Sequence, residues 1–457
     1  MRKIRTDRKD PMIDTRKLSL YQCAEMMRRE RLGAEELLEA CLARVDARED
    51  TVQAWAALYR EQALELARQR DREAKRHQWA GPLHGLPLGI KDIFDVAGME
   101  TRAGSDAYPP RMATEDAESV ARLREAGGII LGKTVTTAFA MGDPNKTRNP
   151  WNPAHTPGGS SSGSGAGVAD GMCLGALGTQ TGGSVVRPAS YNGVIGFKPG
   201  HGEISVEGVL PLAWQLDHVG TLTRTVEDAH MLWHLLRTNQ TLEWQSSREK
   251  MPPALLPRQP QRVWRLREVF EDQAHPEMND AVESVCQTLA ARGVEIVERN
   301  LPSAFAGMAE AHHIIMAAEA ATVHARAFGL DPDAYPPNIS RLIREGQEFG
   351  ATDYVGALRH RIRLISQMNA ALSDVDCILM PGAPGPAPEG LESTGNPFFN
   401  VMSSLCGLPA VGFPAALGTG NLPLGVQVIG RVGGEDELLG FAGWCESAVS
   451  FPHLPGD

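Results

Sequence analysis

Residues 156–200 read TPGGSSSGSGAGVADGMCLGALGTQTGGSVVRPASYNGVIGFKPG and are dominated by glycine and serine. A stretch of this composition is often a flexible linker. Here, however, it passes directly into short apolar segments, after about Met172 and Gly193, and Gly-Gly-Ser recurs at 182–184 within an apolar frame. Glycine repeated beside serine indicates that the backbone closely approaches another group. We therefore expect this stretch to belong to the folded core and to carry functional residues.

The segments on either side alternate between helical and extended patterns. Ser19 and Gln22 form a capping box that predicts a helix ending near Gly33, and leucine spacing in 34–45 predicts a second helix that continues, highly charged, to about His77. Further helices are predicted at 115–126, 275–292, 304–328, 338–349, 354–373 and 435–449, and strands at 85–98, 127–134, 293–298, 377–382, 409–414 and 425–430. This alternation predicts an α/β fold with a large mixed sheet between layers of helices.

No internal repeat or linker divides the chain. We expect a flexible basic tail at residues 1–17 and one domain at residues 18–457. The segment that most resembles a linker, Ser246–Pro260, is interpreted as a loop on the surface of the domain.

The composition limits the class of protein. Of 457 residues, 42% are hydrophobic and 22% are charged, and the net charge is −11. These values exclude a disordered, collagenous or nucleic-acid-coating protein and predict no attraction to anionic membranes. The seven cysteines form no CxxC pair, which favours buried thiols in a reducing compartment. Without an apolar leader or a membrane-length apolar run, the predicted location is the cytoplasm.

Two short motifs match well-known patterns without the structural context that these patterns need. Residues 127–134, GGIILGKT, satisfy G-x4-G-K-[ST], but Ile129–Leu131 belong in a buried strand and the preceding segment is helical, so nucleotide binding is not expected. Residues 159–163, GSSSG, satisfy G-x-S-x-G. A nucleophile elbow follows a strand, whereas the preceding residues are rich in proline. An α/β-hydrolase-type esterase with Ser161 as nucleophile therefore stays an alternative.

A third pattern joins GIKD at 89–92, GGSS at 158–161, GTQTGGS at 178–184 and GFKP at 196–199. In this order and spacing the blocks resemble the amidase signature family, strongly over about residues 85–230 and more weakly to the C-terminus. The resemblance implies a single α/β/α domain around a mixed sheet. It also implies a Ser–cis-Ser–Lys triad with Ser184 as nucleophile, Ser160 as the bridging serine after a cis peptide bond, and Lys91 as the base.

The residues themselves suit this chemistry. A serine hydroxyl needs a neighbouring base, and no histidine lies within the blocks around either serine. A lysine can act as that base only when burial or nearby cations lower its pKa. Lys91 lies in an apolar frame, LGI before it and IF shortly after it. The backbone N–H groups of Thr181, Gly182 and Gly183 are expected to form an oxyanion hole, where one donor contributes about 3 kcal/mol.

Two departures from the family pattern bear on the substrate. Many members have GTDTGGSxR, whereas this chain has Gln180 in place of Asp and its arginine at position 187, three residues after Ser184. This arrangement resembles a malonamidase-like branch in which the arginine faces a substrate carboxylate. Arg187 either binds substrate or holds the loop. Trp214 either lines an apolar entrance or is part of the core, and Asp217-His218 is expected to order a loop.

We expect a serine hydrolase that cleaves the C–N bond of small amides through an acyl-enzyme. The same machinery would accept an ester or an aryl carbamate (urethane) that fits the pocket. His312 and His313, with Glu319 and His324, could suggest metal ligands, but His313, Glu319 and His324 do not share one helix face at the required spacing. Packing is therefore the expected role of these residues, and no cofactor or metal is needed. The expected partner is a small-molecule amide or carbamate, with no nucleic acid and no membrane, and the family resemblance suggests a homodimer. The alternatives are the glutaminase (A-type) subunit of a tRNA-dependent amidotransferase, the Ser161 esterase, and a non-catalytic binding protein.

Overall fold

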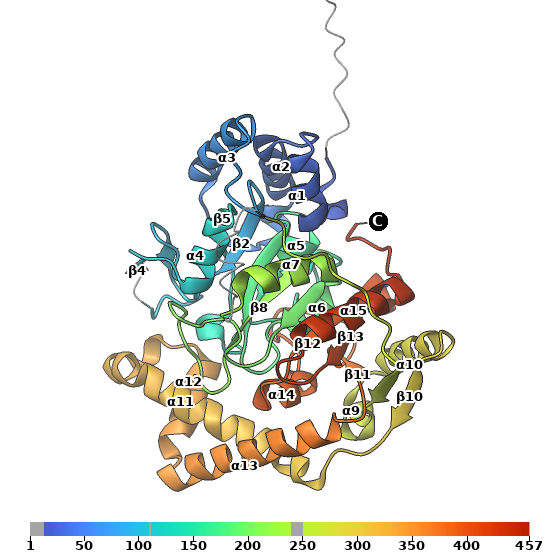
Figure 1. The fold of residues 1–457 in the computed structure, drawn as a ribbon. Helices are drawn as coiled ribbons and strands as arrows, with labels where there is room; N and C mark the ends of the chain where they lie inside the picture. Colours follow the sequence, from blue (N-terminus) through green and yellow to red (C-terminus); the bar gives the residue numbers. More distant parts are fainter. Residues whose placement is uncertain (1–12, 109–110, 239–249, 457) are drawn as a thin grey trace, which may run out of the picture.

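The computed structural model describes residues 13–108, 111–238 and 250–456, and within these residues a large mixed sheet runs through the molecule (Figure 1). Helices flank this sheet, so the predicted fold class is confirmed. From one edge to the other, its eleven strands are β1 (Trp55–Leu58), β5 (Ile129–Thr134), β2 (Pro87–Lys91), β6 (Gly175–Gln180), β8 (His218–Thr223), β7 (Ile195–Lys198), β12 (Ala410–Gly418), β13 (Leu422–Ile429), β11 (Cys377–Pro381), β9 (Arg262–Arg265) and β10 (Glu295–Glu298).

The helices and the smaller elements complete the fold. A separate two-stranded sheet consists of β3 (Glu100–Thr101) and β4 (Arg111–Met112). Short 3-10 helices span Thr15–Lys17, Ala138–Ala140, Ser303–Gly307, Pro332–Ala334 and Thr419–Asn421. The α-helices are α1 (Leu20–Arg28), α2 (Ala34–Val52), α3 (Arg60–Ala74), α4 (Glu118–Glu125), α5 (Ser162–Ala169), α6 (Val186–Asn192), α7 (Val226–Leu236), α9 (Glu268–Gln273), α10 (Pro276–Ala290), α11 (Met308–Leu330), α12 (Pro337–Glu348), α13 (Ala351–Ala371), α14 (Phe398–Leu405) and α15 (Glu435–Val449). Among the described residues, no helix is long and apolar enough to span a membrane.

Strand direction determines where functional side chains collect. β2 runs parallel to both of its neighbours, β5 and β6, whereas β6, β8, β7, β12, β13 and β11 pair antiparallel in succession. The register pairs Ile90 with Leu177, so β2 and β6 end at the same edge of the sheet. Carboxyl ends of parallel strands are the usual place for ligands in α/β sheets. Lys91 and the segment after β6 therefore lie at this edge.

Both faces of the sheet are buried. Successive side chains of a strand point to opposite faces, and β11 illustrates this. Cys377 and Leu379 pack into the apolar cluster that includes residues of α7, α10 and α15. Ile378 and Met380 pack into a second cluster, which includes residues of α13 and α14. The sheet thus separates two helical layers.

Two boundaries differ from the sequence prediction. The long helix expected from residue 34 to about His77 is interrupted, because Gln53 adopts a left-handed conformation (φ 52°) that ends α2. The next residues form β1, which pairs with β5, and α3 then begins at Arg60. At the N-terminus, residues 1–12 of the expected tail lie outside the described residues. Thr15 belongs to a short helix and is buried, with its hydroxyl donating to the Gly171 carbonyl at 2.7 Å.

Candidate active site

Lys91 is the last residue of β2, and its side chain is completely buried (0% exposed). A central strand covered on both faces explains the apolar sequence around it. Its Nζ lies 2.7 Å from Ser160 Oγ and 2.8 Å from Thr179 Oγ1. Burial lowers the pKa of Lys91 well below its ordinary value, the negative charge of Asp217 opposes this shift, and the positive charge of Arg187 adds to it. This amine is therefore suited to be uncharged at neutral pH.

Ser160 follows a cis Gly159–Ser160 peptide bond immediately before α5, and its side chain is buried. The hydroxyls of the next two serines, Ser161 and Ser162, form hydrogen bonds to backbone groups. Ser161 Oγ donates to the Thr179 carbonyl at 3.3 Å and accepts from the Thr179 N–H at 3.3 Å. Ser162 Oγ donates to another backbone carbonyl at 2.7 Å. Of the three serines, Ser160 is thus the one that meets the buried amine.

Glycines allow the close packing that brings these loops together. A Cβ at Gly178, in β6, would lie 2.7 Å from Ser161 Oγ. A Cβ at Gly163, in the first turn of α5, would lie 2.1 Å from the Ala54 carbonyl oxygen. Neither position has room for a side chain, which confirms the prediction that this glycine-rich stretch marks close backbone approach.

Ser184 lies in the turn between β6 and α6, and its side chain is 9% exposed. The structure brings Lys91 and Ser160 together, but among the hydrogen bonds of the described residues none joins the Ser184 hydroxyl to either of them. The backbone N–H groups of Gly182, Gly183 and Ser184 likewise have no acceptor among the described residues. These are the donors that an oxyanion hole requires.

Side chains from distant parts of the chain hold this turn. Gln180 Oε1 accepts from the N–H groups of Val185 and Val186, both at 3.0 Å, and its Nε2 donates to Ser404 Oγ at 3.1 Å. Ser404 Oγ in turn donates to the Gly182 carbonyl at 2.7 Å. Because this hydrogen bond holds the Gly182 carbonyl, the N–H groups of the turn are left available to bind an acceptor. Gln180 therefore holds the start of α6, and among the described residues no hydrogen bond joins it to the Arg187 side chain.

Two further residues fix Thr181 at the start of the turn. The Nε2–H of His312 donates to the Thr181 carbonyl at 2.9 Å, and Thr181 Oγ1 donates to Asp217 Oδ1 at 2.5 Å. Asp217 Oδ2 accepts from the N–H groups of Leu212 and Ala213 at 2.8 and 3.0 Å. Burial raises the pKa of Asp217 to about 6 against these hydrogen bonds. Asp217 orders a loop, as the sequence predicted, and joins it to the turn that carries Ser184.

Arg187, in α6, is 4% exposed and points toward the loop of Ser160. Its Nη2 donates to the Gly159 carbonyl at 2.6 Å and to Thr394 Oγ1 at 3.3 Å, while Nε and Nη1 are buried without a protein partner. Burial lowers the pKa of Arg187 to about 10, so the group stays charged at neutral pH. The guanidinium therefore holds the loop and keeps two unused N–H-bearing nitrogens.

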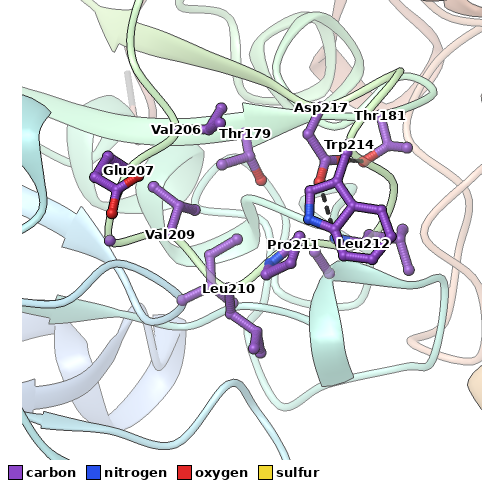
Figure 2. A pocket seen from close by; sticks show the side chains of 13 residues that line it. Thr179, Thr181, Val206, Glu207, Val209, Leu210, Pro211, Leu212, Trp214 and Asp217 are labelled. Atoms are coloured by element: carbon purple, nitrogen blue, oxygen red, sulfur yellow. Dashed lines mark hydrogen bonds between the residues drawn. The ribbon is translucent and has the colours of Figure 1, made fainter. Parts of the chain in front are cut away.

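A cavity of about 280 Å3 opens beside this edge of the sheet (Figure 2). Its lining includes Thr179, whose hydroxyl contacts Lys91, and Thr181, at the start of the turn that carries Ser184. Most of the other lining residues are apolar. Trp214 lines it and is 46% exposed, which favours the entrance over the core. The remaining lining residues are Ile93, Ala140, Val206, Glu207, Gly208, Val209, Leu210, Pro211, Leu212 and Asp217.

The metal-ligand candidates and the phosphate-loop lysine that the sequence suggested each contact a different partner. His313 pairs with Glu345 at 3.1 Å, and His324 lies 3.3 Å from the Tyr335 hydroxyl. Glu319 Oε1 accepts from the Tyr354 hydroxyl at 2.5 Å. The GKT lysine of residues 127–134, Lys133, lies in the buried strand β5 and pairs with Asp92 at 2.8 Å. The phosphate-loop pattern therefore lies in a strand and does not form a loop.

Comparisons with known proteins agree with this geometry. The family model described as "Amidase" matches residues 36–439. The A-type subunit of the glutamyl-tRNA(Gln) amidotransferase of Akkermansia muciniphila is 33% identical over 93% of this chain and 98% of its own length. A solved structure described as an amidase is 35% identical and superposes with a TM-score of 0.86 over 95% of this chain and 100% of its own. The native peptide amidase of Stenotrophomonas maltophilia is 26% identical, with a TM-score of 0.82 over 96% and 98%.

The fold and the site therefore define an amidase-type hydrolase acting on carbon–nitrogen bonds. The chain belongs to the amidase signature family. The alternative of an α/β-hydrolase-type esterase is wrong, because the family match covers most of the chain and Ser161 is completely buried, with its hydroxyl bonded to strand β6.

Proposed function

We propose that this protein hydrolyses small amides through an acyl-enzyme formed on Ser184, with Lys91 as the base and Ser160 as the proton carrier between them. The observation that carries the proposal is the buried Lys91 amine, which lies 2.7 Å from Ser160 Oγ with its pKa well below the ordinary value. An uncharged amine in contact with one hydroxyl has the chemistry needed to activate a second hydroxyl.

The proposed steps conserve every proton. Ser184 Oγ attacks the carbonyl carbon and its proton passes to Ser160 Oγ, while the proton of Ser160 passes to Lys91 Nζ. When the tetrahedral intermediate breaks down, the proton returns through Ser160 to the departing amine nitrogen. Water then repeats the sequence on the acyl-enzyme and releases the acid. For the first step, the Ser184 side chain rotates to hydrogen-bond Ser160, since catalytic hydrogen bonds commonly tighten only when substrate binds.

The turn after β6 is proposed to stabilise the oxyanion. The sequence predicts Thr181, Gly182 and Gly183 as donors, and the unused N–H groups at Gly182, Gly183 and Ser184 support that position. Each donor of this kind contributes about 3 kcal/mol to the transition state. The hydrogen bonds from His312 and Ser404 to neighbouring carbonyls fix the direction of these groups before substrate arrives.

The pocket supports a small substrate with an apolar part. We propose that Trp214 covers this part at the entrance. Arg187 is not among the residues that line the cavity; we propose that it binds a carbonyl or carboxylate through its two unused nitrogens, beside the Ser160 loop that it contacts. Aryl amides, carbamates and esters fit this description. We also propose that the enzyme is cytoplasmic and that it forms a homodimer.

A second function is favoured by the curated relatives. Several are A-type subunits of glutamyl-tRNA(Gln) amidotransferases, at 29–33% identity over more than nine-tenths of this chain. In this second proposal the chain is the glutaminase component of a larger assembly, and the unused nitrogens of Arg187 suit the carboxylate of glutamine.

One panel of substrates tests both functions. The purified chain is assayed with p-nitroanilides, neutral primary amides, carbamates, esters and L-glutamine, beside Ser184→Ala. We expect turnover of neutral amides that Ser184→Ala abolishes, and a fluorophosphonate adduct on Ser184. Turnover of L-glutamine alone supports the glutaminase function, and an adduct on any other serine contradicts the proposed nucleophile.

A further inference from the structure

A cluster of two histidines and one aspartate lies outside the active site, between α7 and α15. His230 and His234 are one helical turn apart on α7, and Asp436 is in the first turn of α15. Figure 1 shows these two helices side by side. None of the three residues takes part in the proton transfer or substrate binding proposed above.

The three ligand atoms are spaced as a metal ion requires. The two imidazole Nε2 atoms are 3.1 Å apart, and Asp436 Oδ1 lies 3.2 Å from His234 Nε2 and 3.9 Å from His230 Nε2. A triangle with these sides has a circumscribed radius of about 2.0 Å, which is the length of a Zn–N or Zn–O bond. An ion at this centre lies in the plane of the three atoms. Tetrahedral ligands of Zn²⁺ are about 3.3 Å apart, so a small movement of the exposed Asp436 side chain that shortens the 3.9 Å separation completes the geometry.

The protons of the cluster also favour a cation at its centre. A neutral imidazole carries one N–H, and an ionised carboxylate only accepts hydrogen bonds. If the Nε2–H of His234 donates to Asp436, the same hydrogen is shared with the lone pair of His230 Nε2, which is 3.1 Å from His234 Nε2. If His230 donates instead, a lone pair of His234 faces the carboxylate. A cation bound by all three lone pairs removes this conflict.

The surroundings orient the carboxylate and leave a path for the ion. Trp233 Nε1 donates to Asp436 Oδ1 at 2.9 Å, and Arg237 Nη1 contacts the other oxygen, Oδ2, at 3.3 Å. Such outer hydrogen bonds are typical of metal-binding carboxylates. The two imidazoles are buried, whereas the Asp436 side chain is 53% exposed, so the cluster opens to solvent on that side.

We propose that His230, His234 and Asp436 bind a divalent transition-metal ion such as Zn²⁺, and that this ion holds the C-terminal helix α15 against α7. Imidazole and carboxylate ligands suit ions of this class. The remaining coordination positions take water from the exposed side. The site is structural, because it shares no residue with the active site.

Zinc titration of the full-length protein tests the proposal. The protein is treated with a chelator, dialysed at neutral pH and titrated with Zn²⁺ in a calorimeter. We expect one equivalent to bind the wild type saturably and to raise its Tm. His234→Ala weakens binding by more than about 100-fold, because it removes a ligand rather than an outer contact, and Zn²⁺ no longer raises the Tm of this variant.

Two further variants make the result decisive. Asp436→Asn changes an exposed side chain and is expected to fold normally, so it tests the site even if His234→Ala does not fold. It should weaken binding by about tenfold or more. His313→Ala removes an exposed histidine from a His–Glu pair on another helix and should leave the Zn²⁺ equivalent unchanged. The proposal is overturned if the wild type binds no saturable equivalent, or if that equivalent survives in both His234→Ala and Asp436→Asn.

Discussion

Two lysines are completely buried on neighbouring parallel strands, yet their surroundings are opposite. Lys133, on β5, forms an ion pair with Asp92 at 2.8 Å and contacts Thr101 Oγ1 at 3.0 Å. Lys91, on β2, meets two hydroxyls, those of Ser160 and Thr179. Both strands are central and apolar, so burial is common to the two amines. The difference between them is the counter-charge.

The counter-charge determines what each amine can do. Burial lowers the pKa of both lysines. For Lys133, the adjacent Asp92 carboxylate favours the protonated form and opposes that shift. For Lys91, the nearest polar groups are neutral, and its pKa falls well below the ordinary value. A buried lysine with a carboxylate is thus a structural cation, whereas one with hydroxyls is suited to be a base.

The largest effect is expected when the lysine without a counter-charge is replaced. Lys91→Met keeps the apolar volume but removes the base, so kcat should fall by up to about 10⁴-fold. The Tm should change little, because no charge loses its partner. Steady-state kinetics and thermal unfolding measure the two quantities. Near-normal turnover at pH 7 in a folded Lys91→Met enzyme means that the base is another group.

The matched change at the other lysine should affect stability. Lys133→Met leaves the Asp92 carboxylate buried without its cation, which costs about 3–5 kcal/mol of unfolding free energy. Chemical denaturation measures this loss. The double variant with Asp92→Asn should recover much of it, since no buried charge then remains. If Lys133→Met is as stable as the wild type, the ion pair is not what holds this amine.

A smaller effect is expected at the second hydroxyl. Thr179→Val preserves the shape of a buried strand residue but removes the hydrogen bond to Lys91 Nζ at 2.8 Å. The loss of one such contact, about 1 kcal/mol, should lower kcat by about five- to tenfold. Thr223→Val on the neighbouring strand β8 is the control and should leave kcat unchanged. Equal loss in both variants would show a packing effect rather than an effect on the amine.

The smallest effects concern pH. Activity should rise with pH as Lys91 loses its proton and should not fall again through the lysine range, because the base acts uncharged. The negative charge of Asp217 favours protonated Lys91 and the positive charge of Arg187 disfavours it. Asp217→Asn should therefore move the acid limb of kcat/KM to lower pH and Arg187→Met to higher pH, each by about one unit at most. Shifts in the reverse directions contradict this assignment.

Much of the site follows from local sequence. The order of GIKD, GGSS and GTQTGGS indicates which loops meet, and the glycines indicate close approach, as Gly163 and Gly178 confirm. The contacts that hold the turn after β6 do not follow from it. His312 and Ser404 lie 131 and 222 residues from the carbonyls that they bind. The sequence predicts only packing for His312, because nothing in its own helix indicates its partner.

The sequence predicts an element well when its own residues carry the signal. It predicts a strand less well when the strand forms only by pairing with a distant part of the chain. The capping box at Ser19 and the buried strand at 129–134 are present. The sequence predicts helix at β1 because its four residues, WAAL, carry no strand alternation, and they become extended only by pairing with β5. It does not reveal β8, because His218–Thr223 mixes polar and apolar residues, although the strand is buried between β6 and β7.

The order of the strands has a consequence for how this protein is made. β12 and β13 are synthesised after all other strands of this sheet, yet they lie inside it, between β7 and β11. Domains that emerge from the ribosome usually fold as units. Here the edge of β7 has no neighbour on that side until residues beyond 400 leave the exit tunnel, and Ser404 arrives in the same segment. A nascent chain that stalls earlier is therefore left with an open sheet, and the turn after β6 lacks its hydrogen bond from Ser404.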